Sequence, residues 1–234
     1  HPINDKWKNV WHWFIFGGSI LAPFLLGVLF TSILRGMPID ENMTMWATFT
    51  DYVNIYSVVG GLAVVLLTLV HGLTFIGLRT TGPVHTRALA LLKKVYMVLF
   101  GGLVVFAVLT YFNTDLFTVR PVATPVFLVC IVLAAVLGFI FANKGKEGWA
   151  FTMSGLTIVL TVAMLFVGLF PRVMISSIDP AFNLTIDNAA SGQYTLSLMT
   201  KISLTLLPFV LGYQIWSYYI FRKRISHKDT VNYE

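Results

Sequence analysis

Histidine side chains are the strongest candidates for chemistry in this sequence, and one of them lies inside a long apolar segment. His71 is within such a segment, and His12 lies at the end of another, whereas His1, His85 and His227 are in polar stretches. Imidazoles from apolar helices commonly hold haem in membranes, so His71 and His12 form the first candidate cofactor site. The alternative for His71 is a hydrogen-bonded histidine between packed helices, and the motif evidence for haem is poor.

Two further reactive side chains interrupt the apolar segments. Lys201 lies near the start of the last apolar run, where its aliphatic stem could reach the headgroup region; an ion pair with a neighbouring subunit or contact with a ligand headgroup are the alternatives. The single cysteine, Cys130, can form neither an intrachain disulfide nor a metal cluster by itself. The sequence contains nothing that resembles a catalytic triad or a nucleotide-binding loop. We therefore assign no catalytic or metal-binding residue, and keep His71, His12 and Lys201 as candidates for cofactor contact.

The composition indicates the environment of the chain. Of 234 residues, 57% are hydrophobic and only 11% are charged, with a mean hydropathy of +0.80. Soluble domains carry about 25% charged residues, because their surface must be hydrated. The net charge of +6 comes from cations in short segments between apolar runs, which is typical of membrane proteins and does not indicate nucleic-acid binding. The sequence predicts a polytopic membrane protein.

Long runs without acidic or basic residues define the expected membrane spans. A helix needs about 20 apolar residues to cross the hydrocarbon core, and the strict alternation of a membrane β-barrel is absent. We therefore expect an all-α fold in which 1–234 form a single membrane domain of six transmembrane helices in a bundle. The expected spans are 9–34, 52–78, 95–114, 121–143, 148–171 and 202–221.

The distribution of lysine and arginine predicts the orientation of the spans. With the N-terminus inside, 12 of the 16 cations fall on the cytoplasmic side, including Lys6 and the group Arg222, Lys223, Arg224 and Lys228 near the C-terminus. The other four are Arg35, Arg120, Arg172 and Lys201. This bias in short loops is the positive-inside pattern, so both termini are expected to be cytoplasmic.

The segment 172–200 is expected to be an ordered outer loop. It combines polar turn-forming residues with apolar Met174, Ile178 and Phe182, which a simple solvated loop would not need. Its last part, the charge-free run 188–200, is short and contains Ser191 and Gly192, and we interpret it as loop. The whole segment is therefore expected to pack as a cap on the helices.

Several motifs, spread from about residue 7 to residue 224, resemble a known family. The most specific group lies in and around the outer loop. The motifs are WKNVWHW at 7–13, FGGS at 16–19, HG at 71–72, FP at 170–171, SS at 176–177, DP at 179–180, LT at 184–185, YTL at 194–196 and YQIW at 213–216. Together they resemble subunit II of cytochrome bd-type quinol oxidases. The first three helices of that family are missing from this sequence, and no residue from them can be carried over.

The resemblance implies a function and a set of partners. It implies a membrane complex that oxidises quinol, reduces O2 to water and contributes to a proton-motive force. Haem b and haem d are expected in the partner, subunit I, while this chain is expected to be a haem-free subunit. A structural quinone, small single-span subunits and the lipid bilayer are the other expected partners. The implied location is a bacterial or archaeal cytoplasmic membrane.

Two other classes of function remain open from the residues alone. A transporter or channel is disfavoured because the spans contain so few charges, whereas such proteins usually carry intramembrane carboxylates or interrupted helices. Substrate-dependent flux through the purified chain would support it. A structural assembly factor would instead leave the oxidase as the complex matures.

Overall fold

The computed structural model describes residues 5–220, with the side chains described from Trp7 onward. The expected cytoplasmic cations Lys6, Arg222, Lys223, Arg224 and Lys228 therefore lie outside the described residues or side chains. In chain order the elements are α1 (Asp5–Arg35), α2 (Phe49–Tyr52), α3 (Ile55–Arg79), α4 (Pro83–Asn113), α5 (Leu116–Val119), α6 (Ala123–Asn143), α7 (Glu147–Leu169), β1 (Arg172–Met174), η1 (Pro180–Phe182), β2 (Leu184–Thr185) and α8 (Gln193–Ile220).

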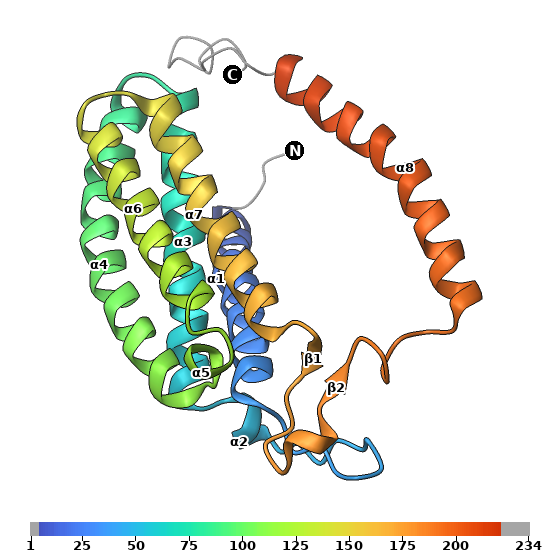
Figure 1. Cartoon of the computed structure of the whole chain (residues 1–234). Helices are drawn as coiled ribbons and strands as arrows, with labels where there is room; N and C mark the ends of the chain where they lie inside the picture. Colours follow the sequence, from blue (N-terminus) through green and yellow to red (C-terminus); the bar gives the residue numbers. More distant parts are fainter. Residues whose placement is uncertain (1–4, 221–234) are drawn as a thin grey trace.

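Among the described residues, six helices are long and apolar enough to cross a membrane. They are α1, α3, α4, α6, α7 and α8, so the prediction of an all-α protein with six spans is confirmed. Five of them pack side by side, and α3 contacts α1, α4 and α7 (Figure 1). The sixth, α8, stands apart from the others in Figure 1 and has no buried residue. Its apolar surface is accessible to lipid or to another chain.

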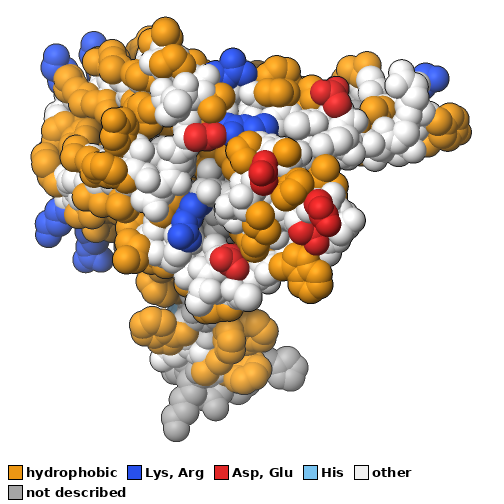
Figure 2. Space-filling view, turned by 60° about the horizontal axis from the view of Figure 1, so that its bottom comes forward, with side chains coloured by type: hydrophobic (Ala, Val, Ile, Leu, Met, Phe, Trp, Pro, Cys, Tyr) orange, Lys and Arg blue, Asp and Glu red, His pale blue; other side chains and the backbone are white. Residues whose placement is uncertain are grey.

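The bundle has two ends of different character. At one end, which we call the turn end, short turns join α3 to α4 and α6 to α7. At the opposite loop end lie α2, α5 and the antiparallel pair β1–β2, in which Arg172 faces Thr185. Figure 2 shows acidic side chains gathered on the loop end, with basic side chains among them. The longer connections, and therefore most of the polar structure, lie at this end.

The prediction that 188–200 is a loop was wrong for its second half. Helix α8 begins at Gln193, so 193–200 is helical and continues without a break into the expected span. Of the four residues that suggested a loop, Asn188, Ser191 and Gly192 precede the helix and Gln193 is its first residue. Asn188 accepts a hydrogen bond from the Thr185 backbone. From Gln193 onward the chain contains good helix formers such as Leu196 and Met199. Helix α4 likewise begins earlier than the expected span, at Pro83, because proline fits the first turn of a helix.

The first part of the segment 172–200 has a defined conformation. Ser176 is buried, and its hydroxyl donates to the carbonyl of Ile39, 2.8 Å away. The Met37 amide donates to the carbonyl of Ile175 at 2.8 Å. These contacts tie the segment after α7 to the segment after α1, so the two long loops form one cap over the loop end.

Close packing between α1 and α3 depends on glycine. A β-carbon at Gly61 would lie 2.7 Å from the Phe24 ring and 2.9 Å from the Phe24 carbonyl oxygen. A β-carbon at Gly60 would collide with Thr31. By contrast, among the described residues, a β-carbon at Gly17, Gly18 or Gly101 would meet no atom within 4 Å. The sequence contains three pairs of adjacent glycines, at 17–18, 60–61 and 101–102. Of these, the pair at 60–61 allows α1 and α3 to approach each other closely.

The turn after α1 gives a pH-dependent prediction. Asp40 accepts hydrogen bonds from Trp46 Nε1 at 2.8 Å and from the Thr44 and Asn42 amides at 2.9 Å. These bonds, that of Trp46 first, hold the pKa of Asp40 below its ordinary value of 3.8. Because the pKa of Asp40 is lower in the folded protein, its ionised carboxylate stabilises the fold at pH values above the unfolded pKa. This contribution is lost as the pH falls below 3.8.

We expect the fluorescence of Trp46, obtained as the difference between the unmodified protein and Trp46→Phe, to change in that acidic range. The change should be absent in Asp40→Asn. An identical titration in Asp40→Asn would contradict this assignment.

Candidate functional site: a polar cluster around His71

His71 lies on α3 and forms a polar cluster with Thr74 of the same helix and Ser154 of α7. Its Nδ1 is 2.9 Å from the Ser154 hydroxyl, and the Thr74 hydroxyl is 3.1 Å from the same oxygen. The imidazole stacks on the ring of Phe151, with centroids 4.5 Å apart and an angle of 21° between the planes. Thr74 and Ser154 are buried. The structure therefore agrees with the hydrogen-bonded interhelical histidine that was the alternative to haem ligation.

The hydrogen bonds of the two hydroxyl groups indicate the protonation of the ring. Ser154 Oγ donates to the Phe151 carbonyl at 2.8 Å, and Thr74 Oγ1 donates to the His71 carbonyl at 2.7 Å. With both hydroxyl protons used in this way, the proton between His71 and Ser154 belongs to Nδ1 of the ring. Nε2 then carries the lone pair, and no described side chain donates a hydrogen bond to it. This nitrogen could accept a hydrogen bond or bind a metal.

The other two candidates lie away from this cluster. His12 is exposed on the N-terminal half of α1, while the ring of His71 packs against α7. Lys201 is exposed on α8, and no described carboxylate lies within 4 Å of its amine. The structure therefore does not bring His71, His12 and Lys201 together. In the part of the chain that it describes, no three His, Cys, Asp or Glu side chains are grouped to hold a metal ion.

A second histidine joins three helices at the turn end. His85, on the first turns of α4, places Nδ1 3.1 Å from the Gly77 carbonyl of α3 and Nε2 3.2 Å from Glu147 of α7. Both neighbours are hydrogen-bond acceptors, so the imidazole links α4 to both α3 and α7. Sequence analysis missed this pair, because His85 and Glu147 are far apart along the chain and each lies in a polar stretch.

An ion pair organises the loop end. Arg172 of β1 makes a two-pronged contact with Asp115, which precedes α5; Nη2 lies 3.1 Å from Oδ1, and Nη1 contacts Oδ2. The Arg172 side chain is only 12% exposed, whereas that of Asp115 is 40% exposed. Nearby, Arg120 donates to the Phe170 carbonyl at 2.7 Å. These arginines had been assigned only by their side of the membrane, and their partners have no signal in the sequence.

Next to this ion pair lies a polar cavity of about 470 Å³. Its lining includes Arg35, Asn113, Asp115, Arg172 and Asn183. The cavity combines hydrogen-bond donors and acceptors, but the described residues around it include no paired nucleophile and base. It can therefore bind a polar group, and its side chains suggest no covalent chemistry.

Comparison with known proteins identifies the family. A profile described as "Cytochrome bd terminal oxidase subunit II" matches residues 1–221. The chain belongs to the cytochrome bd terminal oxidase subunit II family. The resemblance seen in the sequence motifs is thereby confirmed.

Relatives in this family match over almost the whole chain. The chain is 50% identical over 228 residues to cytochrome bd ubiquinol oxidase subunit 2 of Bacillus subtilis, covering 97% of this chain and 68% of that protein. It is 28% identical over 257 residues to cytochrome bd-I ubiquinol oxidase subunit 2 of Escherichia coli K12, covering 96% of this chain and 68% of that protein. A probable cytochrome oxidase subunit 2 of Haemophilus influenzae is 26% identical over 247 residues, or 92% of this chain and 65% of that protein.

Proposed function

We propose that this chain works as subunit II of a cytochrome bd-type quinol oxidase, a membrane complex that oxidises quinol and reduces O2 to water. The observation that carries the proposal is the family match over 1–221, together with 50% identity to a ubiquinol oxidase subunit. Six apolar helices are consistent with a subunit embedded in the bilayer. In this role the chain contributes to an enzyme that generates a proton-motive force.

Within the complex, the chain serves as a haem-free subunit, and the haems b and d belong to subunit I. The chemistry around His71 supports this role, since Nδ1 is bound to Ser154 and the ring stacks on Phe151. A haem held by two imidazoles would need a second histidine facing Nε2, and His12 is exposed on another helix.

The membrane location and further partners follow from the same proposal. The excess of cations at the turn end, which includes Arg79, Arg87, Lys93 and Lys144, supports a cytoplasmic turn end and cytoplasmic termini. A bacterial or archaeal cytoplasmic membrane is the corresponding location. Small single-span subunits and a structural quinone are the remaining components expected. Mass spectrometry of the intact complex and of its organic extract would detect them.

Co-purification is the direct test of this function. The tagged chain, extracted in mild detergent, should carry a haem-bearing membrane subunit in a 1:1 ratio, and the preparation should consume O2 with quinol as the electron donor. A chain that purifies without a haem protein, or one that leaves the complex during maturation, would contradict the proposal.

The haem assignment gives a separate prediction. The chain isolated from its partner should give no pyridine haemochrome signal, because no second described histidine is available to face Nε2 of His71: His12 is exposed on α1, and His85 is held by Gly77 and Glu147. In the intact complex, His71→Ala should leave the b-type and d-type haem content unchanged, with Thr68→Ala, on an exposed position of the same helix, as the matched control. A stoichiometric haem that is lost with His71→Ala would overturn the assignment.

A further inference from the structure

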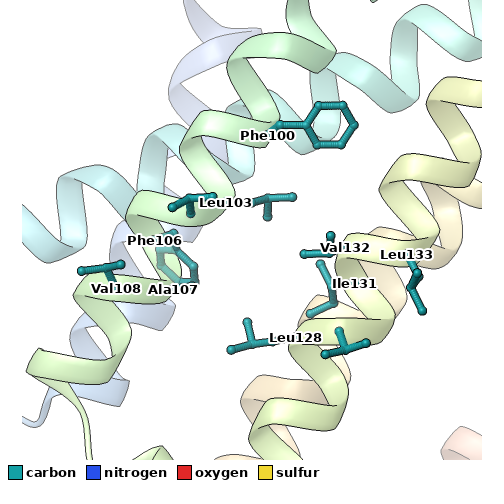
Figure 3. A pocket seen from close by; sticks show the side chains of 11 residues that line it. Phe100, Leu103, Phe106, Ala107, Val108, Leu128, Ile131, Val132 and Leu133 are labelled. Carbon is teal, nitrogen blue, oxygen red and sulfur yellow. The ribbon is translucent and has the colours of Figure 1, made fainter.

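An apolar groove lies between α4 and α6, partway along the two helices (Figure 3). Its volume is about 480 Å³, and every side chain that lines it is apolar, from Phe100 to Val108 on α4 and from Leu128 to Leu133 on α6. Val104 is 66% exposed and Val129 is 58% exposed. The groove therefore opens on the surface of the bundle. Figure 1 shows that α4 and α6 lie on the side of the bundle away from α8.

The groove exists because α4 and α6 touch closer to the turn end and diverge beyond it. A β-carbon at Gly138 of α6 would lie 2.5 Å from the Tyr96 hydroxyl of α4, so a larger residue there would displace the end of the Tyr96 side chain. Phe139 of α6 packs against Tyr96 and Phe100, with ring centroids 5.5 Å and 5.9 Å away. Past this aromatic contact, aliphatic side chains line two separated helices, and Figure 3 shows the space between them.

Lysines continue both walls of the groove toward the turn end. Lys93 precedes Val104 by 11 residues, and Lys144 follows Leu133 by 11 residues. Eleven residues make about three helical turns and about 16 Å of rise, so Lys93 lies on the same face of α4 as Val104. Lys144 directly follows the last residue of α6, at about the same distance from Leu133. Both lysines are exposed. Between Lys93 and the groove lies Met97, which is 59% exposed and apolar.

The spacing matches one leaflet of a bilayer. The hydrocarbon core is about 30 Å thick, so one acyl chain covers about 15 Å. An exposed lysine with apolar surface beneath it therefore places a cation at the headgroup level and the groove at the depth of the chain. Basic sites between membrane helices bind anionic lipid headgroups.

We propose that the α4–α6 groove holds an acyl chain of an anionic phospholipid whose phosphate is bound by Lys93 and Lys144. Charge favours the turn end over the loop end as the headgroup position. Among the side chains that the structure describes, Glu147 is the one acid at the turn end, and it pairs with His85. At the loop end, the described cations near the start of α6 already have protein partners: Arg172 pairs with Asp115, and Arg120 donates to the Phe170 carbonyl. A quinone tail could also enter an apolar groove, but a quinone has no anionic group for the two lysines.

The test uses the membrane complex extracted with this chain and stripped of lipid in detergent. Native mass spectrometry would measure binding of dioleoyl phosphatidylglycerol and of dioleoyl phosphatidylcholine, which have the same chains and differ in net charge. Lys93→Gln combined with Lys144→Gln should weaken phosphatidylglycerol binding about thirty-fold and leave phosphatidylcholine binding unchanged. Ala107→Phe, which fills the groove, should weaken both lipids.

Matched controls separate the groove from general effects. Arg87→Gln with Lys201→Gln removes the same charge elsewhere, and Ala90→Phe adds the same ring to an exposed position of α4; both should bind like the unmodified protein. Equal affinity of the unmodified protein for the two lipids, or unchanged binding in Ala107→Phe, would overturn the proposal. So would displacement of phosphatidylglycerol by a long-chain ubiquinone at equal concentration. Quinol oxidase activity is measured separately, because lipid selectivity does not depend on the proposed oxidase function.

Discussion

Replacing Gly61 by leucine is expected to separate α1 from α3 and to lower the apparent melting temperature by about 6–12 °C. Overfilling a packed interface costs about 1–3 kcal/mol, and 1 kcal/mol shifts the melting temperature of a domain of this size by about 2–4 °C. The upper end applies here, because the new side chain would meet the backbone carbonyl of Phe24 as well as its ring. A thermal scan of the detergent-purified protein, followed by loss of monodispersity, measures this effect.

Gly72 provides the matched control on the same helix. It lies 11 residues after Gly61, on the same face of α3, but a β-carbon there would meet no described atom within 4 Å. Gly72→Leu should therefore change the melting temperature of the isolated chain by much less than Gly61→Leu. Equal losses in the two variants would show that leucine acts through the membrane or the backbone, and that the contact with α1 is not responsible.

Breaking the ion pair at the loop end is the second large effect that we expect. Asp115→Asn should leave the Arg172 guanidinium, 12% exposed, without a carboxylate. Removing one partner of a buried pair costs about 3–5 kcal/mol. Because the side chain of Asp115 is 40% exposed, water already screens part of the interaction, and we expect about 1–3 kcal/mol. The free energy of unfolding in denaturant, compared between variant and unmodified protein, measures the loss.

A double-mutant cycle distinguishes the pair from its separate charges. Arg172→Gln combined with Asp115→Asn should be less destabilised than the sum of the two single variants, since the double variant leaves no unpaired charge. Asp187→Asn, at an exposed acid of the same end, is the matched control and should have little effect. Additive losses from Arg172→Gln and Asp115→Asn would mean that the contact contributes no coupling energy.

The sequence by itself determined the class of the protein, its six spans and its family. These properties depend on features that each segment carries alone. A run of about 20 apolar residues must be a helix in lipid, because its backbone groups have no other hydrogen-bond partners there. The family motifs are likewise local patterns, and they matched the profile over 1–221. The position of His71 within an apolar helix could likewise be predicted, because its apolar neighbours are visible in the sequence.

The start of α8 shows where local patterns become ambiguous. Gln193, Thr195 and Ser197 are compatible with either a loop or the first turns of a helix. The polarity of Gln193 and of the residues before it suggested a loop, whereas the chain forms a helix from Gln193 onward. A helix can extend beyond the hydrocarbon core without changing the apolar length of its span.

Only the tertiary structure decided which residues meet across helices. His71 with Ser154, His85 with Glu147 and Asp115 with Arg172 are separated by 57 or more residues. Their contacts depend on the rotation of each helix about its axis, which uniformly apolar segments leave open. The same is true of the three glycine pairs, of which the pair at 60–61 lies in a contact with α1. The groove between α4 and α6 arises in this way too, because Phe139 of α6 packs against Tyr96 and Phe100 of α4 at one level, and apolar side chains line the space between the helices beyond it.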